Sequence, residues 1–163
     1  MPPSTKYLTA SITAGIALFS SLLLTAAPLP RGSAAAAQSL WAKARLITPA
    51  ALASELREGK KPVIVCVGFS FLYEAAHIPR ALLEGPASEA AGLAKFKQWA
   101  QSQPKDTPVI IYCGCCPFAE CPNIRPAYFA LLHAGLTRVQ VLDLRHNFAT
   151  DWVQKGYPTE RSK

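Results

Sequence analysis

Four of the five cysteines of this 163-residue chain lie within nine residues of one another. They are Cys113, Cys115, Cys116 and Cys121, and the fifth is Cys66. Thiols at this spacing can act as nucleophiles, exchange disulfides or ligate a soft metal ion. Cysteines that only staple a small scaffold would not need to be gathered in one short segment. We therefore expect the cluster to be a site of chemistry.

The elements that must position this cluster alternate between strand and helix. Short β-branched runs are expected to form buried strands at 63–67, 109–112 and 139–142. Capping residues and apolar spacing predict helices at 50–58, 88–101, 127–134 and 151–155. This alternation predicts an α/β domain with a mainly parallel sheet and helices on both of its faces.

The cysteine cluster directly follows the expected strand 109–112, and so leaves its carboxyl end. In open parallel sheets, ligands bind at the loops beyond the carboxyl ends of the strands. The position of the cluster therefore indicates a functional site rather than a structural one.

Cys113 is the first residue of this loop and is the expected nucleophile. Free backbone N–H groups and the start of the next helix would stabilise its thiolate, so we expect its pKa to be lowered. The same loop, at Gly114, Cys115 and Cys116, is expected to bind an anionic substrate through its N–H groups. Arg125 would either add positive charge to that pocket or be an ordinary solvated arginine.

Three sequence segments support a resemblance to a known family. They are Glu74 with Ala76-His77-Ile78-Pro79-Arg80-Ala81, then Val109-Ile110-Ile111-Tyr112-Cys113, and finally Trp152, Gly156 and Pro158. By their order and spacing, residues 46–158 resemble a rhodanese-like domain. The resemblance implies a central five-stranded parallel sheet flanked by helices on both faces.

The resemblance also implies an activity. A rhodanese-like sulfurtransferase takes a sulfane sulfur from a small anionic donor such as thiosulfate and holds it as a cysteine persulfide. It then passes the sulfur to a thiol or cyanide-like acceptor, and it needs no cofactor. By position, the persulfide-forming cysteine is Cys113.

The chain departs from the family pattern in three places. Cys66-Val67-Gly68 replaces the usual Asp-Val-Arg, and His146-Asn147 replaces a pair of glycines. Eleven residues, 114–124, separate Cys113 from Arg125, where the family has a much shorter loop.

The extended loop leaves two alternative functions open. Cys115, Cys116 or Cys121 could form a disulfide or resolve an intermediate on Cys113, which would give a thiol–disulfide redox protein. Alternatively, Cys113, Cys115, Cys116 and Cys121 could ligate zinc, copper(I) or an iron–sulfur cluster, in a metal-binding or catalytically inactive module.

The N-terminal segment predicts export. Residues 1–37 hold two basic residues, Lys6 and Arg31, with an uncharged run at 8–27 and small residues at 34–37, as in a signal peptide cut after Ala37 or after Ala27. An uncleaved anchor is the alternative, and only then would the protein contact a membrane. We expect a signal peptide at 1–37, a linker at 38–45, a rhodanese-like domain at 46–163, and a bacterial periplasmic location.

The charge of the chain argues against nucleic acid as a partner. The net charge is +7 for the whole sequence and +5 without residues 1–37, which is ordinary for a soluble domain. The basic residues are scattered rather than gathered in a patch.

Overall fold

The computed structural model describes residues 43–162. Within this range, five parallel strands form a sheet in the order β1-β5-β4-β2-β3. The strands are β1 (Leu46–Ile47), β2 (Val63–Cys66), β3 (Leu82–Leu83), β4 (Val109–Tyr112) and β5 (Val139–Leu142). The predicted α/β class and five-stranded parallel sheet are confirmed.

The expected leader at 1–37 and most of the linker at 38–45 lie outside the described residues. Export and the periplasmic location therefore stay predictions from the sequence. Among residues 43–162, no helix is long and apolar enough to cross a membrane.

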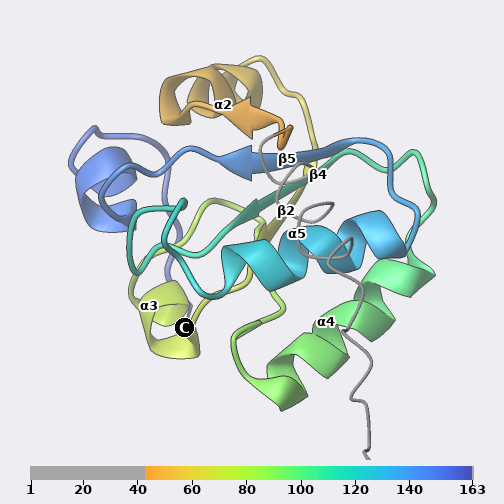
Figure 1. The fold of residues 1–163 in the computed structure, drawn as a ribbon. Helices are drawn as coiled ribbons and strands as arrows, with labels where there is room; N and C mark the ends of the chain where they lie inside the picture. Colours follow the sequence, from red (N-terminus) through yellow and green to blue (C-terminus); the bar gives the residue numbers. More distant parts are fainter. Residues whose placement is uncertain (1–42, 163) are drawn as a thin grey trace, which may run out of the picture.

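Helices cover both faces of the sheet, as expected (Figure 1). They are α2 (Pro49–Arg57), α3 (Ser70–Ala75), α4 (Ala90–Ser102), α5 (Ile124–His133) and the π-helical turn η1 (Ala149–Val153). On the first face, Ile64 and Ile110 pack in a buried cluster with Leu52 of α2 and Trp152 of η1.

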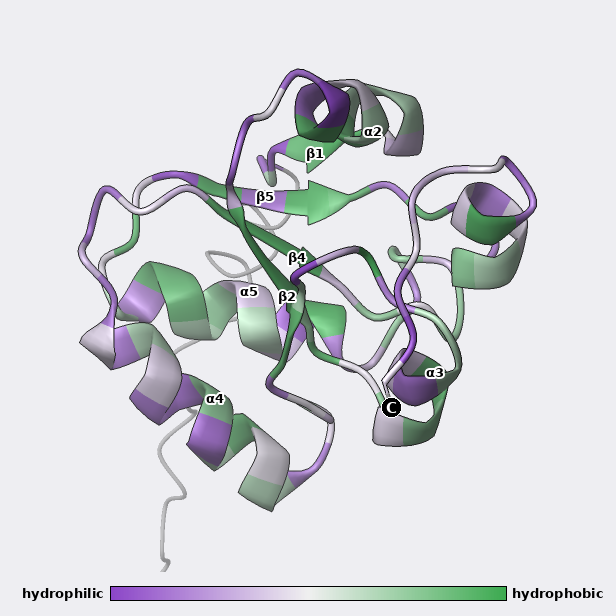
Figure 2. Ribbon diagram, turned by 180° about the vertical axis from the view of Figure 1, so that it is seen from behind, coloured by the Kyte–Doolittle hydropathy of each residue, from purple (hydrophilic) through white to green (hydrophobic). Residues whose placement is uncertain are grey.

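The opposite face of the same strands packs against α4 and α5. Val65 and Ile111 share a second buried cluster with Phe96 of α4 and Leu131 of α5. Because successive residues of a strand point to opposite faces, β2 and β4 must be apolar along their whole length. Figure 2 shows this as continuous hydrophobic colour along both strands.

The sequence pattern misses β1, β3 and α3. Each of the two strands is only two residues long, too short for a periodicity to be recognised, and α3 buries none of its residues. The start of α5 was predicted too late, at residue 127. The helix begins at Ile124 and holds Pro126 in its first turn, where the missing N–H costs no intrahelical hydrogen bond.

The turn η1 also lies two residues earlier than the helix predicted at 151–155. Its fourth residue, Trp152, is fully buried and donates a hydrogen bond from Nε1 to the Pro158 carbonyl over 2.8 Å. The Trp152 ring also stacks on Phe148, with 6.0 Å between the ring centroids. This side chain therefore fixes the segment that follows β5 against the sheet.

Replacing Trp152 with alanine should lower the free energy of unfolding by about 3–5 kcal/mol, because a large buried side chain leaves a cavity. Chemical denaturation measures this change. Phe71→Ala is the control, since Phe71 is 64% exposed, and it should change stability by no more than about 0.5 kcal/mol. Equal effects of the two changes would contradict this account of the core.

Candidate functional site

The cysteine loop leaves the sheet at the carboxyl end of β4, as predicted. It is attached to the segment that follows β5 by two backbone hydrogen bonds. Phe118 N–H donates to the Leu144 carbonyl over 2.8 Å, and Phe148 N–H donates to the Gly114 carbonyl over 3.1 Å. Gly114 has a φ of +93°, a conformation that favours glycine, and its position holds Cys113 and Cys115 on either side of a sharp turn.

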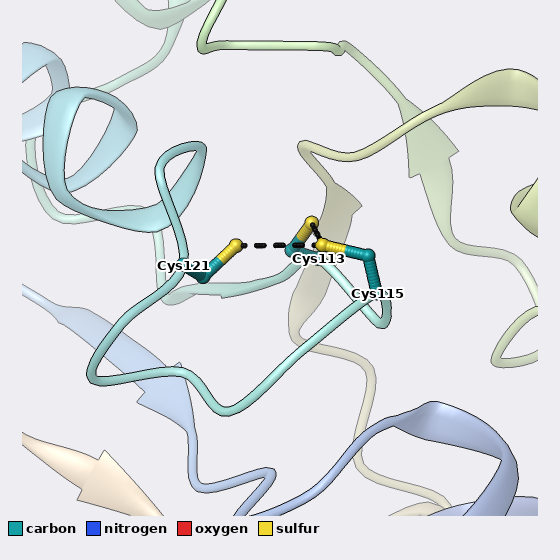
Figure 3. A group of neighbouring side chains, drawn as sticks. All are labelled: Cys113, Cys115 and Cys121. Carbon is teal, nitrogen blue, oxygen red and sulfur yellow. Dashed lines mark hydrogen bonds between the residues drawn. The ribbon is translucent and has the colours of Figure 1, made fainter.

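The sulfur atoms of the loop converge (Figure 3). The Sγ of Cys115 lies 3.2 Å from that of Cys113, 3.0 Å from that of Cys116 and 3.9 Å from that of Cys121. The Sγ atoms of Cys113, Cys115 and Cys121 all lie within 4.8 Å of one another. All five cysteines of the chain are free thiols in this structure.

The thiols differ in their access to solvent. Cys113 and Cys121 are buried, each with 3% of its surface exposed, whereas Cys115 and Cys116 are half-buried. Cys66 is buried on β2, and its thiol donates to the Cys113 carbonyl over 3.7 Å. Cys66 therefore supports the backbone of Cys113.

Asn123 is a site residue that the sequence analysis missed. Its side chain is fully buried, and its Nδ2 donates to the Sγ of Cys113 over 3.3 Å. Its Oδ1 accepts the backbone N–H of Ser88 over 2.8 Å. Because that N–H can only donate, it fixes which end of the amide faces the thiol.

No sequence signal could have found this role of Asn123. Its position directly before α5 is typical of a helix cap, yet the side chain makes no capping hydrogen bond. The contact with Cys113 arises because the eleven-residue loop folds back onto the end of β4.

Gly68 explains one departure from the family pattern. A Cβ atom at this position would lie 2.8 Å from the Sγ of Cys113 and 2.6 Å from the Cys113 carbonyl oxygen. Both distances are too short for a side chain. The glycine therefore lets the loop after β2 approach the Cys113 sulfur closely.

The expectation of a lowered pKa at Cys113 is wrong. The hydrogen bond with Cys121, together with burial, raises the pKa of the Cys113 thiol. The pKa of Cys121 is instead lowered to about 5, by the hydrogen bond from Cys113 and by the backbone N–H groups of Asn123 and Ile124. The N–H groups at the start of α5 face Cys121, so this residue receives the stabilisation that we had assigned to the first thiol of the loop.

An apolar groove of about 450 Å³ adjoins the cysteine loop. Gly114 and Cys115 line it, together with Phe71 and Leu72 of α3, and Phe148. None of the described residues that line this groove is charged.

A much smaller cavity of about 10 Å³ lies at Cys113. Its lining includes Cys113 and Tyr112, and it shares Leu72, Gly114 and Phe148 with the groove. This volume holds about one water-sized group. The buried thiol thus faces a space for a single small group next to a larger apolar opening.

The predicted substrate-binding residues are only partly brought together. Gly114 and Cys115 line the groove, and the sulfur of Cys116 contacts that of Cys115. Arg125 is exposed on the first turn of α5 and is not among the described residues that line the groove or the small cavity.

Two of the three histidines, His77 and His146, have structural partners. The Nδ1 of His77 lies 2.8 Å from the Tyr73 carbonyl, and the His77 ring stacks on that of Tyr73 with centroids 3.9 Å apart. His146 is exposed and its Nδ1 lies 2.9 Å from an Asp151 carboxylate oxygen.

The assignment of the thiolate to Cys121 predicts a pH titration. Near pH 6, the ultraviolet absorbance of thiolates should show one ionised cysteine per chain, with a midpoint near the lowered pKa of about 5. Cys121→Ser should remove this absorbance at pH 6, because an unperturbed thiol ionises only near pH 8.5.

The same shift should appear in stability. The folded pKa of Cys121 lies below the unfolded value, so the stabilisation is complete above about pH 8.5 and is lost as the pH falls through about 5. A wild-type titration with no thiolate below pH 8 would contradict the assignment.

The sequence matches no model of a known protein family and no curated protein. Solved structures do match. The rhodanese-like domain of an Anabaena protein aligns with a TM-score of 0.54 and 21% identity, over 72% of this chain and 79% of its own. A Rhodopseudomonas palustris protein of unknown function, described as a possible tyrosine phosphatase, aligns with a TM-score of 0.57 and 18% identity. The alignment covers 82% of this chain and 98% of that protein.

A thiosulfate sulfurtransferase from Pseudomonas aeruginosa is also similar. It aligns with a TM-score of 0.52 and 22% identity, over 73% of this chain but only 20% of its own length. At these identities the likeness concerns the fold. Together with the parallel order β1-β5-β4-β2-β3 and the cysteine at the end of β4, it leads to one conclusion: this chain has the fold of the rhodanese-like domains.

Proposed function

We propose that the protein is a sulfurtransferase that carries a sulfane sulfur as a persulfide on Cys113. The observation that carries the proposal is the placement of this thiol. Cys113 ends the central strand β4 and faces a cavity with room for one small group, next to a groove that opens beyond it. The outer sulfur of a persulfide is a group of about this size.

The neighbouring thiols support the transfer step. Cys113 and Cys121 are a coupled pair of thiols: their interaction raises the pKa of Cys113 and lowers that of Cys121, so the proton stays on Cys113 and Cys121 is the base that can receive it. As Cys113 attacks the outer sulfur of thiosulfate, its proton passes to Cys121. The bond between the two donor sulfurs breaks, and sulfite leaves with the electron pair.

Asn123 supports the anion that this step creates. Its Nδ2–H already points at the Sγ of Cys113, and its orientation is fixed by the Ser88 N–H. A buried donor of this kind stabilises negative charge that develops on the sulfur, since it needs no rearrangement during the reaction. The acceptor that finally takes the sulfur would be a thiol or a cyanide-like nucleophile.

The sulfur transfer to Cys113 should be visible as sulfite released on incubation with thiosulfate. Wild-type protein should release one equivalent of sulfite per chain, and Cys113→Ser should neither release sulfite nor gain sulfur. Cys116→Ser is the matched control, because Cys116 is a cysteine of the same loop that is not among the described residues lining the small cavity or the groove. A Cys113→Ser protein that still gained sulfur would refute the proposal.

A second candidate function is the binding of a soft metal ion, and one observation favours it. Three sulfur atoms, those of Cys113, Cys115 and Cys121, lie within 4.8 Å of one another. Three thiolates bound to one ion at about 2.3 Å would be separated by about 3.8–4.0 Å. The 3.9 Å between the sulfurs of Cys115 and Cys121 matches this, whereas the 3.2 Å between those of Cys113 and Cys115 would have to lengthen. Cys116 falls outside this group, so the set suits three-coordinate copper(I) better than tetrahedral zinc.

Anaerobic titration with copper(I) against a chelator of known affinity tests this function. Wild-type protein should bind one ion, and Cys121→Ser should lose affinity by at least about tenfold. Cys116→Ser should bind as wild type does, because its sulfur is not in the group of three. Equal affinity of all three proteins would exclude the proposed metal site.

A further inference from the structure

The thiol that the structure places against the sulfur of Cys113 is that of Cys115. The Sγ of Cys115 lies 3.2 Å from it, within the range of about 3–3.5 Å at which reacting atoms are positioned for attack. Cys115 is also half-buried and lines the apolar groove, whereas Cys113 and Cys121 are buried.

We propose that Cys115 is a resolving thiol that releases the sulfur from Cys113 as sulfide. This inference rests on the proposed persulfide. The Sγ of Cys115 attacks the Sγ of Cys113, and a Cys113–Cys115 disulfide forms. The bond between Cys113 and the outer sulfur breaks, and that sulfur leaves as hydrosulfide with the electron pair, taking up the proton that Cys115 loses.

The electrons of this step balance between the two thiols and the sulfane sulfur that Cys113 carries. The sulfane sulfur gains two electrons and becomes sulfide, and the two thiols lose two electrons and become a disulfide. The cycle closes when an external thiol reductant, either a dithiol or two equivalents of a monothiol, reduces the Cys113–Cys115 disulfide.

The sulfur separation selects this route over a relay of the outer sulfur to Cys115. A sulfur atom passing in line between two cysteines needs about 4.1 Å between them, twice an S–S bond of about 2.05 Å. The observed 3.2 Å leaves no such space. Attack on the Sγ of Cys113 needs only the contact that already exists.

Access explains why Cys115 rather than Cys121 has this role. The disulfide that results must be reached by the reductant, and Cys115 lines the groove, while Cys121 is 3% exposed. Cys121 instead remains the base that activates Cys113. The reductant that the groove admits carries an apolar group beside its thiol, since no described residue lining the groove is charged.

The experiment loads the purified chain with thiosulfate anaerobically, without added thiol, and follows three products: sulfite, sulfide and intact mass. Wild-type protein should release one equivalent each of sulfite and sulfide and end two hydrogen atoms lighter. Cys115→Ser should release sulfite, retain one extra sulfur atom and release no sulfide. Cys116→Ser is the matched control and should release sulfide, because both reacting sulfurs are intact.

The sulfite measurement separates the two proposals. If sulfite is released but wild-type protein keeps the extra sulfur, or if Cys115→Ser releases sulfide like wild type, the resolving role is refuted and the persulfide stands. Release of sulfide by Cys115→Ser that stops only when Cys121 is also replaced would assign the role to Cys121 and equally refute it. If wild-type protein and Cys115→Ser both release no sulfite, the sulfurtransferase function itself fails.

Discussion

The burial of β4 on both faces is the constraint on which the rest of the structure depends. Its four residues are buried, and it pairs with β2 on one side and β5 on the other. A strand held in this way cannot slip, because a shift of one residue would exchange the side chains of its two faces. Cys113 is the next residue, so the fixed register of β4 also fixes its position at the carboxyl edge of the sheet.

The loop that follows is long, yet it is held at several points. Backbone hydrogen bonds join Phe118 and Gly114 to the segment after β5, and Asn123 joins the end of the loop to Cys113 and Ser88. A short loop is restricted by its length alone. In this long loop, these hydrogen bonds hold the backbone in one conformation instead. Four thiols are consequently brought to one place, although the loop is too long for the compact turn expected of the family.

The roles of the thiols follow from small differences in their surroundings. Cys121 lies at the start of α5, where N–H groups without helical partners favour its anion. The interaction with Cys121 and burial raise the pKa of Cys113, so Cys113 keeps its proton. Cys115 is half-buried and lines the apolar groove. Three thiols that differ in pKa and in exposure thus lie with their sulfurs within 4.8 Å of one another.

The sequence alone determined the class of fold and the position of Cys113 at the carboxyl end of a central strand. The β-branched runs at β2, β4 and β5 and the cap at Thr48–Pro49 are local signals, and each was confirmed. It could not indicate β1 or β3, since two residues carry no period. Nor could the sequence show that the lowered pKa belongs to Cys121 rather than Cys113, because both are cysteines.

Only the tertiary structure decided which thiol faces the helix start, which faces the groove, and that Asn123 turns away from its helix to Cys113. Those outcomes depend on how an eleven-residue loop folds back across the sheet edge. Contacts between residues distant in sequence set that path, and no local pattern encodes them.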